Sequence, residues 1–375
     1  MTIVVNDLDG NEVGTAESDA DGQWTVPVDE PGTYEVVLDD TTLPEGLGLR
    51  DEEGGRLEVE VLSGRVRPAV FQLGEGSGGR GQVDAFFRAA ANGLKFGLII
   101  AMTAVGLSLI FGTTGLINFA HGELVAFGAL VAWWLNVQTV EWHLFLAAAV
   151  AIVLTAGLGA GFEQGIFKPL RKRRVGLFQL MIVSIGLSLF VRHLLLLFFG
   201  GAPRPYSDFV GQSVVEIGPI ALTPRDMTIM AISAVILIAV ATMLQRTRIG
   251  KAMRAVADNR DLAESSGIDV NRVVMVVWIV GAALAAMGGI LFGSAVAVDW
   301  FMGFRLLLLM FAAVILGGLG TAYGAMVGAI VIGLVTELSV LWFPAELKFM
   351  WALVVLIVVL LVRPQGILGR AERIG

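Results

Sequence analysis

Nine apolar stretches, separated by short polar breaks, follow one another along the chain from Leu94 onward. Most of them are close to the roughly 20 residues that a helix needs to cross a bilayer. They predict membrane-spanning helices at 94–116, 119–137, 142–165, 176–199, 226–244, 273–298, 306–319, 323–342 and 346–362. The seventh stretch is short, so the pattern predicts eight full crossings and either a ninth crossing or a half-inserted segment.

Residues 1–73 have a different pattern, in which apolar and polar positions alternate between turn signals. Such short alternating runs predict strands, here at 24–28, 34–38 and 57–61. Asp9-Gly10, Asp21-Gly22 and Pro31-Gly32 supply the expected turns. Together with 18–24 and 31–34, these turns resemble the carboxypeptidase-regulatory or prealbumin-like domain, a module usually found outside the cytoplasm.

These two patterns predict an all-α polytopic membrane protein with a small N-terminal β-sandwich domain. We assign 1–73 to the sandwich, 74–84 to a Gly-rich flexible linker and 85–375 to the membrane domain. The composition agrees, because 56% of the residues are hydrophobic and the mean hydropathy is +0.78. The chain has no cysteine, which excludes disulfides and thiolate metal sites, and its three histidines are too scattered to suggest a metal centre.

Charge is distributed unevenly between the two parts. Residues 1–80 contain 18 acidic and 5 basic side chains, a net charge of −13, whereas the remaining 15 acidic and 21 basic side chains give +6. The bases of the second part are concentrated at 168–174 and 245–260, which are separated by two predicted crossings. The positive-inside rule places both clusters in the cytoplasm.

The C-terminal bases Arg363, Arg370 and Arg373 lie four crossings after the second cluster and agree with this orientation. Counting back three crossings from the first cluster places the N-terminal domain outside an inner or plasma membrane. No signal peptide precedes that domain in the sequence. We expect a start further upstream with a signal peptide; the alternative is that the first apolar span acts as a reverse anchor.

Polar residues interrupt the first apolar hairpin at 112–123. Ionisable groups at membrane depth are costly and are therefore functional candidates. Asn118, His121 and Glu123 lie within two turns, and the first two share a helix face. One interpretation is a helix-start network, in which Asn118 caps the second helix and His121 and Glu123 bond to each other or to loop carbonyls. The other is a direct role in a transport pathway or its gate, with a proton relay as a weaker form.

Glycines recur at helical spacing near the C-terminus, at Gly320, Gly324 and Gly328. Small residues four apart allow close helix contact, so packing within the chain is the default interpretation and a subunit interface the more specific one. Residues 281–289 support the same argument. Glu163 and Glu337 are isolated acids near helix ends, which we expect to be paired or to snorkel.

The polar stretch 245–268 separates two apolar spans. Its Ala-rich, charged composition without proline predicts one short helix from Ile249 to Glu264, with a stop at Gly267. The simple interpretation is a solvated connector that obeys the positive-inside rule. The more specific one is a docking helix that inserts into a groove on a cytoplasmic partner.

Five blocks resemble the LivH-type permeases of ABC importers for branched-chain amino acids: 106–123, 184–189, the polar stretch 250–268, 316–320 and 363–369. They occur in the family's order, and from the first block to the last they span nearly all of 94–370. The third block looks like the loop that couples such permeases to their ATPases. The resemblance implies that the coupling residues are Gly250, Arg254, Ala255, Ala257, Asn259, Ala263 and Gly267.

The resemblance implies a transport subunit rather than an enzyme. Its expected partners are a LivM-like permease, cytoplasmic ABC ATPases, an extracytoplasmic substrate-binding protein and membrane lipid, with no nucleic acid. The chain has no G-x-x-x-x-G-K-[ST] loop, so no cofactor is expected in it, and ATP belongs to the partner subunits. The expected substrates are branched-chain or other small amino acids; urea or short amides, or a self-contained secondary transporter, are the alternatives. The family generally lacks the N-terminal domain.

Overall fold

The computed structural model describes residues 1–7, 11–19, 24–28, 31–39, 42–43, 47–49, 55–61, 69, 71, 73–75, 82–139, 141–209 and 212–369. Asp9-Gly10, Asp21-Gly22, Arg370, Arg373 and most of the predicted linker lie outside these residues. The chain divides into two compact units, Met1–Gln82 and Val83–Gly375. A strand, β6, ends at Glu75 and a helix, α1, begins at Gln82, so both ends of the predicted linker segment are in regular structure.

The first unit is a small β domain. Its antiparallel four-stranded sheet has the order β2-β1-β3-β5, and a second sheet pairs β4 with β6; the strands are β1 (Thr2–Asn6), β2 (Glu12–Glu17), β3 (Gly32–Asp39), β4 (Leu47–Leu49), β5 (Arg56–Val61) and β6 (Leu73–Glu75). Alternate residues of β1 and β3 form its core, namely Ile3, Val5, Tyr34, Val36 and Leu38. This period of two follows from the pleat of a strand.

The predicted strand at 24–28 is wrong, because these residues have no regular structure. Pro27 stands in the middle of the segment and has no N–H to donate to a ladder. Trp24, Val26 and Val28 nevertheless pack against the core of the domain, and Trp24 contacts Phe71 with ring centroids 6.3 Å apart. The alternation of apolar and polar residues therefore predicted correctly which side chains face the core, although the segment pairs with no strand among the described residues.

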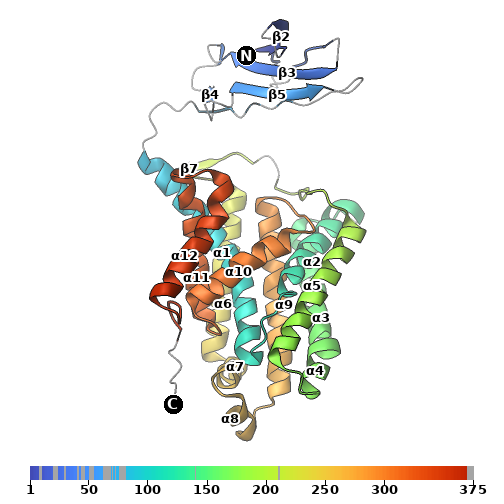
Figure 1. Ribbon diagram of the computed structural model, residues 1–375, viewed down its shortest axis with the longest axis vertical. Helices are drawn as coiled ribbons and strands as arrows, with labels where there is room; N and C mark the ends of the chain where they lie inside the picture. The colour runs from blue at the N-terminus through green and yellow to red at the C-terminus, as the bar shows by residue number, and fades with distance from the viewer. Residues whose placement is uncertain are drawn as a thin grey trace. The chain divides into compact units, whose positions relative to one another are not determined.

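The second unit is a helical bundle with one short hairpin (Figure 1). Its elements are α1 (Gln82–Thr114), α2 (His121–Trp133), α3 (Leu144–Phe162), α4 (Lys168–Lys172), α5 (Leu177–Phe199), β7 (Val215–Ile217), β8 (Ile220–Leu222), α6 (Pro224–Arg246), α7 (Arg248–Asp258), α8 (Arg260–Ser265), α9 (Val270–Ala295), α10 (Met302–Gly317), α11 (Ala322–Leu338) and α12 (Lys348–Val362). A π-helical segment, Trp134–Thr139, follows α2, and another, Glu163–Phe167, joins α3 to α4.

All nine predicted spans are helical, but they differ in length. Among the described residues, seven helices are long and apolar enough to cross a membrane. The other two predicted spans, 119–137 and 306–319, correspond to α2 and α10, which have 13 and 16 residues. The span at 119–137 begins two residues later than predicted, at His121, and its backbone continues past α2 as the π-helical segment Trp134–Thr139. Gly115, with a φ of +69°, separates it from α1.

Helix α2 occupies the centre of the bundle and packs against α3, α5, α9 and α10. Nearly all of its residues are buried, as expected for a helix that is apolar on every side. Close contacts with α9 depend on glycine: a Cβ added at Gly289 would collide with the carbonyl oxygen of Val125. Polar side chains at the start of α2 are therefore enclosed by protein.

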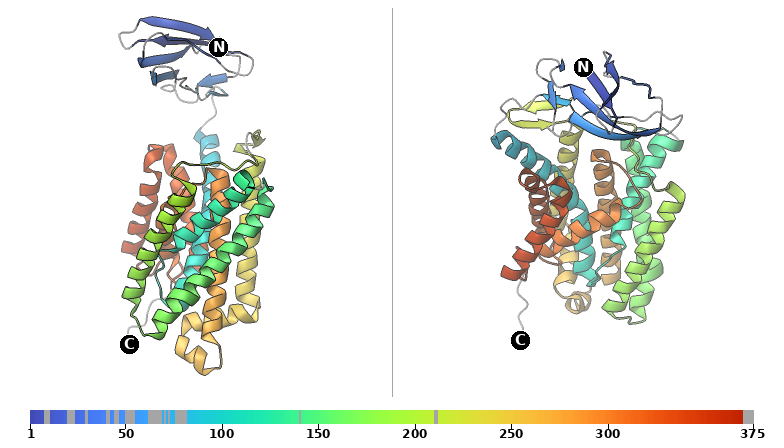
Figure 2. Two further views of the ribbon diagram at one scale, coloured as in Figure 1. Left: turned by 90° about the vertical axis from the view of Figure 1, so that its right-hand side faces the viewer. Right: turned by 45° about the horizontal axis from the view of Figure 1, so that its top comes forward.

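The two ends of the bundle are chemically different (Figures 1 and 2). Helices α4, α7 and α8, which carry the basic clusters, lie at one end. The β7–β8 hairpin lies at the other, where α1 begins. There Arg88 of α1 approaches Glu216 at 3.4 Å and the carbonyl oxygen of Pro219 at 3.4 Å.

Candidate functional site

Asn118 lies in the extended turn that leads into α2. Its Oδ1 accepts a hydrogen bond from the amide of Ala120 at 3.1 Å, and its own carbonyl accepts one from the amide of His121 at 3.3 Å. The N-cap residue of α2 is Ala120, and no side chain caps the helix. The predicted capping role of Asn118 is therefore wrong; the side chain stabilises the turn before the helix, as Asn commonly does.

His121 joins α2 to α1. It is fully buried, and its Nε2 lies 3.1 Å from the carbonyl oxygen of Thr103. Among the described residues no contact joins it to Glu123, so the two side chains do not satisfy each other. The alternative prediction, that His121 bonds to a backbone carbonyl, agrees with this geometry. The carbonyl belongs to helix α1, however, and not to a loop.

Glu123 forms a buried ion pair with Arg192 of α5. Its Oε1 accepts hydrogen bonds from Nε of Arg192 at 3.1 Å, from Nη2 of Arg192 at 2.8 Å and from the hydroxyl of Ser188 at 2.8 Å. The side chain of Arg192 is 8% exposed and that of Glu123 is 0% exposed. Opposite charges that lie this close in a low-dielectric interior compensate much of each other's cost of desolvation.

Two aromatic rings of α10 and the turn before it cover the guanidinium of Arg192. Its Cζ lies 4.2 Å from the ring centroid of Phe304 and 5.4 Å from that of Phe301. Such cation–π contacts are strongest where water is excluded. The ion pair therefore brings together α2, α5 and the start of α10.

A polar stripe on α5 holds this arrangement. Ser184, Ser188 and Arg192 are four residues apart and buried on one face. Ser184 accepts a hydrogen bond from the amide of Phe119 at 3.1 Å, next to the turn that contains Asn118. Arg192 was not among the predicted site residues, yet the spacing i, i+4, i+8 of polar residues within an apolar helix was a signal that could have identified it.

The other acids near the spans are also paired. Glu163 binds Arg171, as expected for an acid near a helix end, and Glu337 lies 3.1 Å from Nζ of Lys348. Asp226 lies 3.0 Å from Nζ of Lys95, which joins α6 to α1. Pairing is thus the common state of these carboxylates.

Hydrogen bonds join the loop between α5 and α6 to the C-terminal half of α2 and to the π-helical segment that follows it. Tyr206 is buried and donates its hydroxyl to the carbonyl oxygen of Ala129 at 3.0 Å, and burial raises its pKa. Asn136 donates to a carboxylate oxygen of Asp208 at 2.9 Å and accepts from the amide of Ser207 at 3.0 Å. This end of α2 is therefore closed by a hydrogen-bonded loop.

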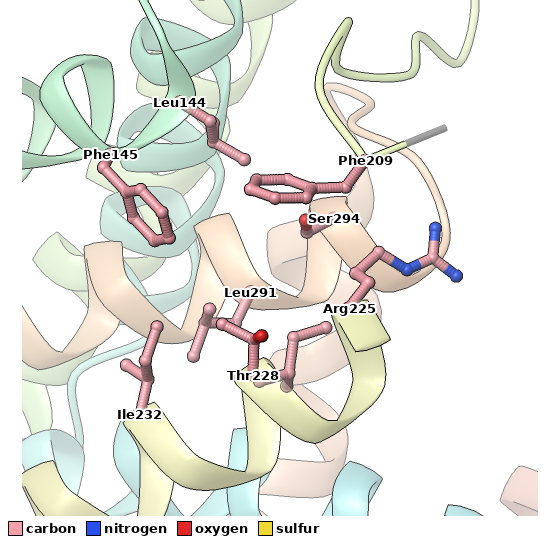
Figure 3. Close-up of a pocket in the computed structure, with 9 residues that line it drawn as sticks. Leu144, Phe145, Phe209, Arg225, Thr228, Ile232, Leu291 and Ser294 are labelled. Carbon is pink, nitrogen blue, oxygen red and sulfur yellow. The ribbon is translucent and has the colours of Figure 1, made fainter. Parts of the chain in front are cut away.

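Figure 3 shows a small pocket between α3, α6, α9 and the residue Phe209. Leu144, Phe145, Phe209 and Leu291 contribute apolar side chains to its walls, whereas the guanidinium of Arg225 points away from it. Without opposite charges in its walls, this pocket does not match an amino acid zwitterion. We therefore assign no substrate to this pocket.

The predicted coupling stretch forms two helices rather than one. Asn259 separates α7 from α8 with extended backbone (φ −157°, ψ 107°), and its side chain accepts a hydrogen bond from the amide of Leu262 at 2.9 Å. The prediction of a single helix is wrong because this side chain caps a new helix instead of continuing the old one. The predicted stop at Gly267 is present, with a φ of +84°.

The residues of the coupling stretch fall into two groups. Gly250 and Ala263 are buried and Ala255 is partly buried, whereas Arg254, Ala257, Asn259 and Gly267 are exposed. A Cβ at Gly250 would lie 2.6 Å from Cα of Leu244, so this glycine lets α7 pack closely against the end of α6. One face of α7 thus holds the bundle, and the other presents basic side chains.

Two of the three C-terminal glycines lie at a helix contact within the chain. Additional Cβ atoms at Gly324 and Gly328 would collide with the carbonyl oxygens of Gly317 and Ala313 on α10. Gly320 lies in the turn before α11 with a φ of +78°, so it does not continue the helical stripe as predicted. The close contact joins α10 to α11.

Seven helices among the described residues are long and apolar enough to cross a membrane, which defines the class of the chain as a polytopic membrane protein. A sequence model of the family "Branched-chain amino acid transport system / permease component" matches residues 89–362. LivH of Escherichia coli K12 is 33% identical over 301 residues, which cover 76% of this chain and 96% of LivH. The chain therefore belongs to this permease family, and it is a transport component rather than an enzyme.

Two further relatives agree with this assignment. The permease BraD of Pseudomonas aeruginosa is 29% identical over 307 residues, covering 78% of this chain and 98% of BraD. The ribose import permease RbsC of Escherichia coli K12 is 29% identical over 245 residues, covering 62% of this chain and 72% of RbsC. These matches leave the identity of the N-terminal β domain as a prediction.

Proposed function

We propose that this chain is one permease subunit of an ABC importer that moves branched-chain or other small aliphatic amino acids into the cytoplasm. The family match across residues 89–362 carries this proposal. Under it, the chain works with a LivM-like permease, two cytoplasmic ATPases and an extracytoplasmic binding protein. ATP binds to the ATPases, so no cofactor is assigned to this chain.

The basic helices α4 and α7 define the cytoplasmic end under this proposal. Both lie at the same end of the bundle (Figure 1), and lysine and arginine are enriched in cytoplasmic loops. Helix α1 begins at the opposite end, so under this proposal α1 enters the membrane from the extracytoplasmic side. This orientation supports an external location for the β domain.

Helices α7 and α8 form the docking surface for an ATPase in this mechanism. Arg254 is exposed on the face opposite the buried Met253 and Val256. Because α7 packs against α6 and α9, movement of an ATPase against α7 would be transmitted to both spans. That transmission would convert nucleotide binding into opening and closing of the pathway.

The test is uptake of labelled leucine into proteoliposomes that contain the whole complex, with ATP and binding protein. We expect uptake by the wild type, and a loss of ATPase association or coupling in Arg254→Glu and Gly267→Trp variants that still insert. Arg173→Glu is the matched control, because Arg173 is exposed at the same end but lies outside the coupling stretch. Normal transport by both loop variants would show that the stretch is only a connector.

The same assay tests the alternatives. Uptake of urea or a short amide without leucine uptake would replace the substrate and retain the permease role. Leucine accumulation by this chain alone, without ATPases, would replace the ABC importer with a secondary transporter.

A further inference from the structure

The ion pair between Glu123 and Arg192 is asymmetric. All three donors converge on Oε1 of Glu123, two from Arg192 and one from Ser188. The second oxygen, Oε2, is buried and has no hydrogen-bond partner among the described residues. A buried carboxylate oxygen without a donor is costly. Oε2 of Glu163 is also buried without a partner among the described residues, so the free oxygen does not by itself distinguish the two pairs. The pair of Glu123 differs in its surroundings, because a serine hydroxyl and two aromatic rings lie beside it.

The groups that form and cover this ion pair have the chemistry of an amino acid receptor. Glu123 supplies a negative charge and Arg192 a positive charge, while Phe301 and Phe304 place aromatic rings beside the guanidinium. A zwitterionic aliphatic amino acid carries the complementary set: an ammonium donor, a carboxylate and an apolar side chain. Arginine is suited to the carboxylate, because its planar fork can donate two parallel hydrogen bonds.

Electrostatics favours an exchange in which Glu123 and Arg192 each bind a charged group of the substrate instead of each other. Removing an ammonium and a carboxylate from water is costly unless each meets an opposite charge. Because the protein pair has no net charge, a zwitterion can enter it and convert one ion pair into two without adding net charge. A neutral solute such as urea needs no such pair.

The location is compatible with a route through the protein. Helix α5 contacts the start of α2 through Ser184, Ser188 and Arg192, so a shift of α5 would separate Arg192 from Glu123. Phe304 is only partly buried, which leaves the aromatic side of the site close to the surface of this chain. In this structure Glu123 and Arg192 bind each other.

We propose that Glu123 and Arg192 form a transient binding site for the zwitterionic substrate, with the substrate ammonium at Oε2 of Glu123 and its carboxylate on Arg192. This proposal rests on the amino acid importer proposed above. It makes Arg192 a specificity-determining residue that distinguishes zwitterions from neutral solutes.

The rival explanation is that the pair only holds α2 and α5 together. A double variant, Glu123→Met with Arg192→Met, separates the two explanations. Replacing both members of a buried ion pair by apolar side chains of similar length is often neutral for stability. If the pair only holds the helices, the double variant should transport normally; if it binds the substrate, transport should fail in a folded protein.

The experiment measures leucine uptake and ATP hydrolysis in proteoliposomes with the assembled complex and saturating binding protein. For the double variant we expect uptake to fall at least about tenfold, the effect of losing one charge-assisted contact, while ATP hydrolysis changes much less. The number of leucine molecules transported per ATP therefore falls. Equal uptake by the double variant and the wild type overturns the binding site alone, whereas no leucine uptake by the wild type overturns the proposed function as well.

A second variant keeps the test decisive if the double variant does not assemble. Arg192→Lys retains the positive charge but not the two-nitrogen fork, and we expect a fall in leucine molecules transported per ATP; an unchanged ratio contradicts carboxylate recognition by Arg192. The control is Glu163→Gln, which breaks the buried pair with Arg171 elsewhere in the chain. This control should retain the wild-type ratio, and an equal fall in it would show a general effect of lost ion pairs.

Discussion

At the scale of single residues, the interior of the bundle is governed by close contact and by charge pairing. Breaking a buried ion pair by removing one partner costs about 3–5 kcal/mol, because the other charge remains desolvated. Glycine allows close contact between backbones: α2 and α9 approach each other where Gly289 faces Val125. The effect of a Gly→Ala substitution on stability should therefore depend on whether the new Cβ meets another atom.

We predict that Gly289→Ala lowers the thermal midpoint of the purified protein, because the new Cβ would collide with the carbonyl oxygen of Val125. Overpacking of this kind costs about 1–3 kcal/mol. Gly157→Ala in α3 is the matched control, since a Cβ there meets no atom within 4 Å. That variant should be neutral or more stable by up to about 1 kcal/mol. Equal midpoints for the two variants would contradict the packing argument.

At the scale of elements, the break between α7 and α8 shows how one side chain can divide a helical sequence. Thr247 caps α7 by accepting from the amide of Gly250 at 3.0 Å, and Asn259 caps α8 in the same way. Helix propensity across 249–264 favours a continuous helix, but a local Asn cap competes with it. The resulting bend changes the direction of the docking surface.

Asn259→Ala should reduce coupling to the ATPases, because it removes the cap of α8 at a cost of about 1 kcal/mol and favours a single straight helix. We expect fewer leucine molecules transported per ATP, with normal membrane insertion. Asn259→Asp retains a capping oxygen and should behave like the wild type. Coupling that is unaffected by the alanine would mean that the bend has no role in docking.

At the scale of the whole molecule, two units have separate cores. The β domain is built around Ile3, Val5, Tyr34, Val36 and Leu38, whereas α2 is the centre of the helical unit. The acidic N-terminal segment of the sequence and its basic remainder correspond to these two units. The orientation of the helical unit in the membrane decides which partners each end can reach.

The absence of cysteine from the sequence allows a direct test of orientation. In intact cells, Ile217→Cys on the β7–β8 hairpin should react with a membrane-impermeant maleimide, because Ile217 is 59% exposed at the proposed outer end. Lys251→Cys on α7 should react only after the membrane is permeabilised. Met253→Cys is the control for burial, since Met253 is 1% exposed on the same helix. The reverse labelling pattern would invert the topology.

The sequence by itself determined the class of the protein and the places of its helices. Hydropathy is a local property, so the nine apolar runs were sufficient to predict the nine apolar helices of the described residues. The motif blocks identified the permease family, which the match over residues 89–362 then confirmed. Local signals also predicted the stop at Gly267, where a positive φ favours glycine.

Only the tertiary structure decided which polar groups meet. Glu123 and Arg192 are 69 positions apart, and their pairing depends on which faces of α2 and α5 pack together. Because His121 and Glu123 are close along the chain, one predicted alternative paired them with each other and the other paired them with loop carbonyls; in the structure His121 bonds to the carbonyl oxygen of Thr103 in α1. The central position of α2 was also decided by packing, because an apolar helix can face lipid or protein equally well. Hydropathy cannot distinguish these two surroundings, so contacts between helices are fixed only when the whole bundle assembles.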